Sequence, residues 1–334
     1  MLKLVNRRVI SSASVCRPHS AHGLWHAPPH RTFLSAIDKF LDDKLPSEAS
    51  PNFDKPAAMV APVILTHGVL GTLLSYPVLG DAISRELGVV ATAAADWDVI
   101  ETSLPLSLGF MISGLISSFF GDAISSMGPR KALLGSAVCI GGGLAMSSLA
   151  VHTHTLPLLY FGFGTSVGAG VGLCYASPIQ TLMSWFPQNK GMCGGIAVSA
   201  IGLGAVLSKE GLERLLQVNT KLPEYIGPSS AFDKILGEGK ALSVEIAGVQ
   251  SEVVEVVSSH VAPCLPALQE GLYLVNSGGS TGAATSLAVM SAVSFSALAA
   301  SSFLIRTPPK DYHEDKSDLF LSPMFDELTA RERV

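Results

Sequence analysis

Charged residues are scarce in this 334-residue chain. Only 15% of its residues are Asp, Glu, Lys or Arg, against about 25% in an ordinary soluble domain. Apolar residues make up 48% of it, and the mean hydropathy is +0.42. A soluble protein of this length needs many more charges on its surface, so the composition indicates a membrane protein. The net charge of −5 offers no basic surface to nucleic acid, which we exclude as a partner.

Catalytic and metal-binding patterns are lacking as well. The five cysteines are odd in number and show no ligand spacing, and no serine in a Gly-x-Ser-x-Gly motif has evident His and acidic partners. His152 and His154 form a His-x-His pair without an accompanying Cys, Asp or Glu, which favours a polar turn over a metal site. The sequence therefore predicts no catalytic residue, no cofactor, no metal and no enzyme activity.

Acidic residues are also absent from residues 1–37, where five Lys and Arg residues lie among serines and histidines. This bias is typical of an organelle transit peptide. We expect cleavage after Phe33, because the stretch RTFLSA resembles the cleavage sites of mitochondrial presequences. A mitochondrial destination is preferred, with a plastid or an untargeted tail as the alternatives. Residues 38–56 form a linker to the rest of the chain.

Beyond the linker, six apolar runs have the length of a membrane span. A bilayer core requires about 20 apolar residues per helix, and the runs are apolar on every side, unlike the alternating strands of an outer-membrane barrel. The predicted fold is therefore an all-α membrane protein with six transmembrane helices. The runs lie near residues 57–80, 99–120, 132–151, 156–182, 191–208 and 281–305.

The charges between these runs predict a topology. Arg130 and Lys131 connect the second and third runs, Lys190 connects the fourth and fifth, and Arg306 follows the sixth. The positive-inside rule places all of them, with the N-terminus, on one side of the membrane. Residues 209–280 are then an extramembrane insertion on the other side, for which a surface decoration is the simplest interpretation. Its segment SVEIAGVQSEVVEVVSSH is interpreted as helical.

Glycines are frequent around the turn at Lys190. Helices in lipid associate through close backbone approach, which small residues allow, and four glycines of the fifth run recur near helical spacing. Trp185 is expected at the height of the membrane interface, and Pro187 ends the fourth helix. The four glycines are Gly191, Gly195, Gly202 and Gly204.

The stretch GVGLCYASPIQTLMSWFPQNKGMCGGIAVSAIGLGA resembles helices four and five of the oxalate/formate antiporter and monocarboxylate transporter branch of the major facilitator superfamily. The pattern there is Gly-x-x-Tyr-x-x-Pro, then Trp-Phe-Pro, a basic residue with Gly, and Gly-x-Gly-Ala. The resemblance extends from about Met59 to Tyr312 and implies the N-terminal six-helix half of a transporter for small mono- or dicarboxylates. The matching residues are Gly172, Tyr175, Pro178, Trp185, Phe186, Pro187, Lys190, Gly191, Gly202, Gly204 and Ala205.

The loop between the second and third helices departs from the superfamily pattern. Ser125 stands where the family has an acid, and Asp122 lies one turn earlier. Asp122 either replaces that acid in coupling the loop to gating, or is a solvated residue at a helix end. Lys190 belongs to the same predicted membrane face. The loop retains the other family residues, Gly121, Gly128, Arg130 and Lys131.

Polar side chains inside the spans are the candidate substrate-binding residues, because such groups are costly in lipid and face a cavity or a partner helix. They are His67 and Tyr76 on the first span and Tyr175 and Gln180 on the fourth. The resemblance favours Tyr175. For each of the four, the alternative is a structural hydrogen bond or an interfacial position.

These observations lead to one leading functional hypothesis and one alternative. The first is a component of a small-carboxylate transporter in the mitochondrial inner membrane, with a plastid membrane as the second location. The alternative is a non-transporting half-transporter or truncated fragment that acts as an assembly or interaction protein. In the resembled family the cationic substrate partners lie in the second half. The six apolar runs contain no Lys or Arg, so we expect no transport by this chain alone, whether it forms a homodimer or awaits a separate second half.

Overall fold

The fold was analysed in a computed structural model, which describes residues 56–229, 235–236, 242–246, 249–256, 270–275 and 277–309. These residues all belong to one compact unit, Pro46–Val334. The predicted transit peptide at 1–37 and almost all of the linker lie outside the described residues. So does the part from residue 310 of the polar tail expected at 306–334, which resembles the start of the family's central loop.

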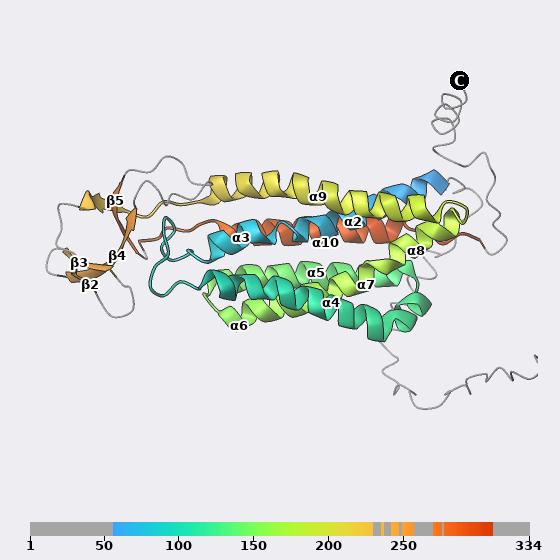
Figure 1. The fold of residues 1–334 in the computed structure, drawn as a ribbon, viewed down its shortest axis with the longest axis horizontal. Coiled ribbons are helices and arrows are strands. Elements are labelled where there is room, and N and C mark those ends of the chain that lie inside the picture. Colours follow the sequence, from blue (N-terminus) through green and yellow to red (C-terminus); the bar gives the residue numbers. More distant parts are fainter. Residues whose placement is uncertain are drawn as a thin grey trace, which may run out of the picture. The chain divides into compact units, whose positions relative to one another are not determined.

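The described part of the chain contains six long apolar helical spans, each long enough to cross a membrane (Figure 1). This confirms the predicted number of spans. They are Pro56–Ile83, Val99–Met127, Pro129–His152, Leu156–Trp185, Lys190–Asn219 and Ala283–Leu304. Four are single helices, namely α4 (Val99–Met127), α5 (Pro129–His152), α9 (Lys190–Asn219) and α10 (Ala283–Leu304).

The first and fourth spans are divided. The first consists of the 3-10 turn η1 (Pro56–Met59), α2 (Val60–Leu73) and α3 (Tyr76–Ile83). The fourth consists of α6 (Leu156–Leu159), the π-helical η2 (Tyr160–Val167), α7 (Gly168–Cys174) and α8 (Ala176–Trp185). A π-helical turn inside a span often marks a functional site. The two candidate residues of the fourth span, Tyr175 and Gln180, follow it.

The glycines of the fourth span bring its backbone against its neighbours. A Cβ atom on Gly168 would lie 2.6 Å from the Gly109 carbonyl oxygen of α4, and one on Gly162 would lie 2.8 Å from the Gly143 oxygen of α5. On the fifth span, four glycines were predicted to allow close helix packing, but only one of them lies against the backbone of another helix. Gly204 packs on the backbone of Gly68, whereas a Cβ on any of the other three meets nothing within 4 Å.

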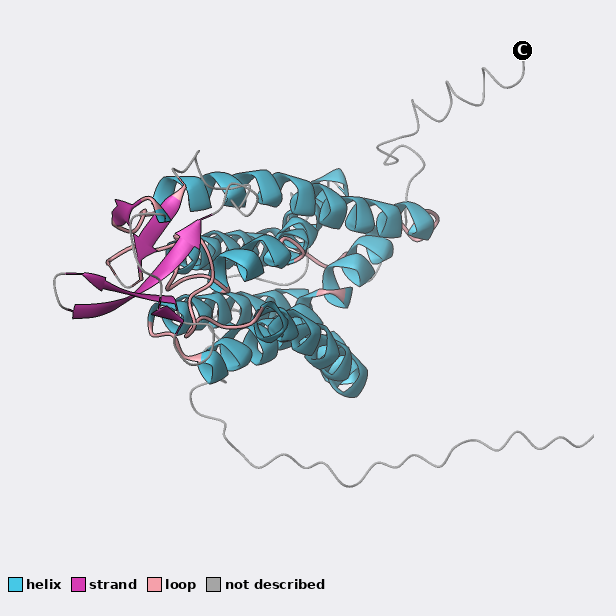
Figure 2. Cartoon of the chain, turned by 60° about the vertical axis from the view of Figure 1, so that its left-hand side comes forward, coloured by secondary structure: helices cyan, strands magenta, loops and turns pink. Residues whose placement is uncertain are grey.

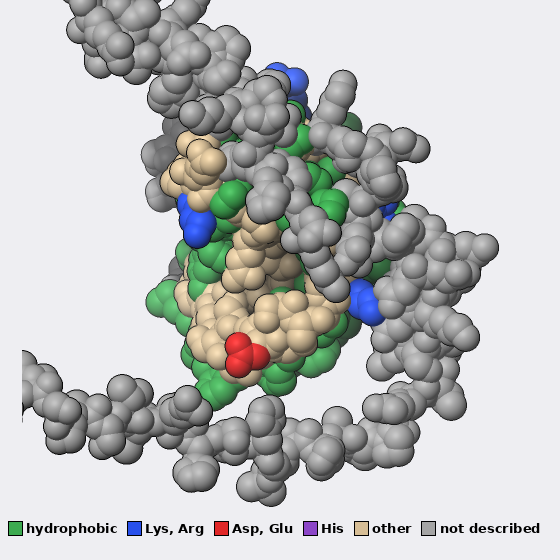
Figure 3. All heavy atoms as spheres, turned by 90° about the vertical axis from the view of Figure 1, so that its right-hand side faces the viewer, with side chains coloured by type: hydrophobic (Ala, Val, Ile, Leu, Met, Phe, Trp, Pro, Cys, Tyr) green, Lys and Arg blue, Asp and Glu red, His purple; other side chains and the backbone are tan. Residues whose placement is uncertain are grey.

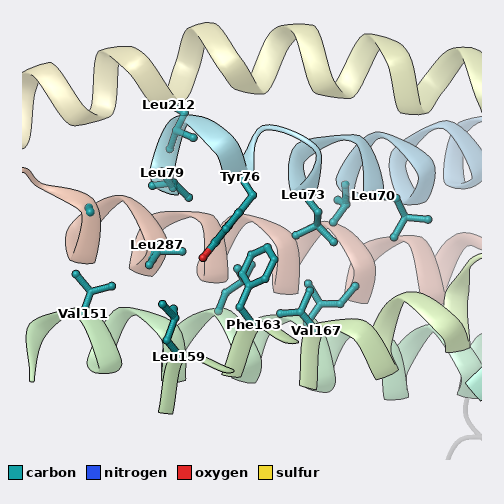
Figure 4. Packing of buried hydrophobic residues seen from close by; sticks show 14 of the residues in the cluster. Leu70, Leu73, Tyr76, Leu79, Val151, Leu159, Phe163, Val167, Leu212 and Leu287 are labelled. Atoms are coloured by element: carbon teal, nitrogen blue, oxygen red, sulfur yellow. The ribbon is translucent and has the colours of Figure 1, made fainter. Parts of the chain in front are cut away.

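A large apolar core joins the first, third, fourth, fifth and sixth spans. Figure 4 shows Tyr76, Leu79, Phe163 and Leu287 converging between the helices of this core. Trp185 closes a second, smaller core with Met59 and Leu182, near the start of α2. Its indole Nε1–H donates to the Arg306 carbonyl oxygen at 2.8 Å, so the ring is buried in the protein instead of facing the headgroups.

The insertion contains a five-stranded antiparallel sheet with the strand order β1-β5-β4-β3-β2 (Figure 2). Its strands are β1 (Tyr225–Gly227), β2 (Ile235–Leu236), β3 (Leu242–Ile246), β4 (Val249–Val256) and β5 (Gly271–Leu274). The helical interpretation of SVEIAGVQSEVVEVVSSH was therefore wrong, because its described part forms β3 and β4.

The sheet has an apolar cluster on each face, as strand alternation requires. Val253 of β4 packs with Val244 and Leu272. Val254, its neighbour, packs instead with Val90 of the segment between α3 and α4. The sheet therefore docks through one face on the 84–98 segment, at the end of the bundle where α9 finishes and α10 begins. Its strands add to the predicted six-helix membrane fold without changing it.

Candidate functional site

The candidate residues His67 and Tyr175 lie at similar depths in their spans. At about 1.5 Å per helical residue, His67 is roughly 16 Å along its span from Pro56, and Tyr175 is roughly 15 Å from Trp185. A hydrocarbon core is about 30 Å thick, which places both near its middle. The ring centroids of His67 and Tyr175 are 6.1 Å apart, so the structure brings these two residues together from different spans.

The two residues carry polar atoms with no hydrogen-bond partner among the described residues. The His67 ring is buried, and its Nδ1 lies 2.9 Å from the Val63 carbonyl oxygen. Since a carbonyl only accepts, Nδ1 carries the hydrogen and donates it. The buried Nε2 atom makes no direct hydrogen bond, although the Tyr175 backbone carbonyl lies close to the ring. The Tyr175 side chain is 46% exposed.

Tyr76 has a structural position. Its side chain is buried, and its hydroxyl donates to the Thr102 carbonyl oxygen at 2.8 Å. Its ring packs on Phe163 at a centroid distance of 4.0 Å. These contacts tie the first span to the second and fourth.

Gln180 is exposed on α8. It makes no hydrogen bond with the described residues and is not placed against the His67–Tyr175 pair.

The predicted gating loop forms the turn between α4 and α5. Gly128, with φ of 84°, precedes Pro129 at the start of α5, a conformation that favours glycine. The Arg130 guanidinium donates through Nε to the Ser302 carbonyl oxygen at 3.2 Å and through Nη2 to that of Phe303 at 3.3 Å. It thereby satisfies carbonyl groups at the C-terminal end of α10, where a cation is favourable.

Asp122 is exposed on the last turns of α4. Its carboxylate makes no ion pair within the described part of the chain, an arrangement typical of a solvated helix end. Gly121 beside it is half-buried, Lys131 is half-buried on α5, and Lys190 is exposed at the start of α9. Figure 3 looks onto this end of the bundle, where basic side chains appear at several places and acidic atoms at one.

At the opposite end, the segment 84–98 holds a polar cluster that the sequence did not predict. Glu86 accepts hydrogen bonds from the hydroxyls of Ser280, at 2.7 Å, and Thr281, just before α10. Asp96 accepts from three backbone N–H groups, those of Leu87, Gly88 and Ala93. Burial raises the pKa of both carboxyl groups, because the charged form loses its hydration.

His154, in the turn after α5, also contacts the 84–98 segment. Its ring stacks on that of Trp97 at a centroid distance of 4.2 Å, and its Nε2 lies 3.0 Å from the Ala95 carbonyl oxygen. Val89, within the segment, has the left-handed φ of 59°, which is rare for a β-branched residue. Only its acidic composition set this segment apart in the sequence. The contacts depend on chain reversals that local patterns do not encode.

Comparisons with known proteins agree with the six-helix architecture. The chain is 26% identical over 170 residues to an uncharacterized MFS-type transporter, YhjX, of Escherichia coli, covering 51% of this chain and 38% of that protein. It is 29% identical over 150 residues to apicoplast pyruvate carrier 1 of Toxoplasma gondii, covering 45% and 25%. It is 28% identical over 149 residues to the oxalate:formate antiporter of Oxalobacter formigenes, covering 44% and 32%.

Vertebrate monocarboxylate transporters match shorter segments, and no family profile matches the chain. The matched segments thus cover well under half of each of these relatives. The six apolar helices define a multi-pass helical membrane protein. The relatives confirm the resemblance to the major facilitator superfamily and support membership of it. They are transporters, not enzymes.

Proposed function

We propose that this chain is a transport component of the major facilitator type that binds a small mono- or dicarboxylate between His67 and Tyr175. The observation that carries the proposal is the meeting of two polar side chains from different spans near mid-membrane, with the His67 Nε2 atom left without a direct hydrogen bond. Substrate sites of such transporters lie near the bilayer midplane. The names of two relatives, a pyruvate carrier and an oxalate:formate antiporter, support a small carboxylate.

The hydrogen-bonding roles of the pair define how a carboxylate binds. Tyr175 offers a hydroxyl donor. In neutral His67 the hydrogen is on Nδ1, so Nε2 is an acceptor and repels a carboxylate oxygen. While Nδ1–H stays bonded to the Val63 carbonyl oxygen, Nε2 becomes a donor when the ring takes up a second proton. The expected complex therefore contains one more proton than the free protein, and carboxylate affinity rises as pH falls.

Equilibrium binding of radiolabelled oxalate, formate, lactate and pyruvate to the full chain in liposomes tests this proposal. We expect saturable binding of at least one of them, stronger at pH 5.5 than at pH 7.5. Tyr175→Phe removes the donor and is expected to weaken binding roughly tenfold, the effect of losing one charge-assisted hydrogen bond of about 1.5 kcal/mol. Tyr160→Phe is the matched control on the same span. Binding that is absent, or unchanged in Tyr175→Phe, contradicts the proposal.

A second candidate function, an assembly protein, is favoured by the exposure of two helices. Only 11% of the most apolar stretch of α4 and 17% of that of α9 are buried, against 50% in the first and third spans. The occupant of these faces would be a second copy or a separate six-helix half. Disulfide crosslinking of Gly114→Cys and Gly202→Cys variants in membranes distinguishes a homodimer from a heteromer by product mass. If crosslinks form and Tyr175→Phe leaves carboxylate binding unchanged, the assembly function is favoured over transport.

For location, we propose an organelle membrane, the mitochondrial inner membrane first. The acid-poor residues 1–37 support this, and one relative is named as an apicoplast carrier. A fusion of residues 1–50 to a fluorescent protein is expected to enter mitochondria. A plastid signal reassigns the organelle, and a diffuse cytosolic signal contradicts the proposal.

A further inference from the structure

An apolar groove runs along the outside of the bundle between α2, α9 and α10. It encloses about 450 Å³. Apolar side chains and glycines from all three helices line it, among them Leu65, Gly68, Leu203, Gly211 and Val293. The Thr72 and Ser208 hydroxyls within it donate to the carbonyl oxygens of Val69 and Ala205, so they offer no free donor to the groove.

The groove has the depth of one membrane leaflet. Its lining on α9 runs from Ala200 to Leu215, roughly 22 Å at about 1.5 Å per residue. The Leu215 end is near the sheet-side end of α9, and the Ala200 end is near mid-membrane. A linear hydrocarbon chain that enters from the headgroup level fills such a space.

Arg214 lies beside the lining residue Leu215 near the sheet-side end of α9, although it is not itself a lining residue. Arg214 follows the lining residues Leu207 and Leu203 by seven and eleven residues, so the three share a helix face. It is roughly 36 Å along α9 from Lys190, beyond a core of about 30 Å. The Arg214 side chain is exposed and makes no ion pair with any described residue. Lys209, a neighbouring cation about 8 Å earlier along α9, is instead paired with Glu213, Nζ to Oε1, at 3.8 Å.

We propose that this groove is a binding site for one anionic phospholipid. An acyl chain lies between α2, α9 and α10, and the phosphate binds the Arg214 guanidinium, whose planar donors suit phosphate geometry. The apolar lining is as long as one membrane leaflet is deep, and Arg214 lies near its headgroup end. Together these two features favour a phospholipid over a polypeptide as the occupant. The site is separate from the His67–Tyr175 pair and does not depend on the proposed function.

Native mass spectrometry of the full chain in mild detergent, with phosphatidylglycerol or phosphatidylcholine of the same acyl chains, tests the site. We expect one retained phosphatidylglycerol, preferred over phosphatidylcholine. Arg214→Gln is expected to lower that preference roughly fivefold, the effect of one basic residue near anionic lipid. Lys209→Gln, about 8 Å earlier along α9 and on another face, is expected to leave it unchanged.

Variants that block the groove provide a second test of the lipid site. A Cβ atom at Gly211 meets nothing within 4 Å, and Gly211 lines the groove, so Gly211→Leu and Gly211→Trp are expected to fill it and to abolish retention of both lipids. Gly202→Leu and Gly202→Trp, at an equally open glycine outside the lining, are the controls. Retention unaffected by both Gly211 variants overturns the proposal, as does an unchanged preference in Arg214→Gln. A dimer lost in the Gly211 variants also overturns it, because a second copy then covers the groove.

Discussion

Tyr76 illustrates how a polar side chain inside a span serves packing. Its hydroxyl donates to the Thr102 carbonyl oxygen, so Tyr76→Phe is expected to lower the free energy of unfolding by about 1 kcal/mol. Tyr175→Phe is the matched control, because the Tyr175 hydroxyl has no partner among the described residues, and its effect is expected to be near zero. Denaturant unfolding in detergent measures both. Equal losses in the two variants would show that the Thr102 contact adds nothing.

Gly204 and Gly202 differ in what surrounds them, although they are two residues apart. A Cβ at position 204 collides with the backbone of Gly68 on α2, whereas one at 202 meets nothing. Gly204→Ala is therefore expected to destabilise the protein by about 1–3 kcal/mol through overpacking. Gly202→Ala is expected to be neutral or slightly stabilising, since Ala is the better helix former. Thermal melting of both variants measures this, and a reversed order contradicts the observed α2–α9 contact.

The sequence located the candidate residues more readily than it assigned their roles. Polarity within apolar runs was enough to select His67, Tyr76 and Tyr175, because such groups need a reason to be in lipid. Which of them meet depends on the rotation of each helix about its axis. A repeat of glycines does not fix that rotation, and Gly202 and Gly204, two residues apart, lie about 200° apart around the helix and so could not share the face to which both were assigned.

At the scale of elements, the 84–98 segment and the start of α10 form a pH-dependent junction. Burial raises the pKa of the Glu86 carboxyl, so the folded state holds its proton more tightly than the unfolded state does. This contribution to stability is complete below the ordinary glutamate range and is lost as pH rises through the raised pKa. The Asp96 carboxyl, raised for the same reason, acts in the same direction.

Glu86→Gln is expected to remove part of this pH dependence. Hydrogen exchange of residues 281–287 is expected to speed up in the wild-type chain as pH rises through that window, after correction for the intrinsic rate. In the Gln variant the increase is smaller, and Asp96→Asn gives a comparison at the neighbouring carboxyl. An identical pH profile in wild type and Glu86→Gln means that Glu86 does not control the junction.

The elements themselves were predictable to different degrees. Spans of about 20 apolar residues are a local signal, and all six were found from hydropathy. Within the sheet, β3 and β4 form a local hairpin that the sequence-based prediction missed, whereas the pairing of β4 with β5 spans the intervening part of the chain and is not visible locally. The alternation of Val253 and Val254 between two clusters was the available signal. The continuation of α9 to Asn219, past the apolar run, was also missed.

For the whole molecule, we expect binding without translocation. The cations on the described spans lie near their ends, including Lys209 and Arg214 on the extended α9. In the bound complex the protonated His67 ring is the cationic partner of the carboxylate, whereas a carboxylate that leaves this site through the bilayer loses that partner, at a cost of several kcal/mol. Liposomes containing the full chain alone are expected to show no saturable oxalate, formate, lactate or pyruvate uptake. Saturable uptake abolished by Tyr175→Ala contradicts this.

Side-specific labelling tests the central claim most directly, namely that the chain crosses the membrane six times with its sheet on one side and the turn before α9 on the other. Lys190→Cys and Glu224→Cys, both at exposed positions, are introduced singly into a chain whose native cysteines are replaced by serine. With a membrane-impermeant maleimide on sealed vesicles, the account predicts that one variant reacts from outside and the other only after permeabilisation. Labelling of both from the same face would contradict the six-span topology.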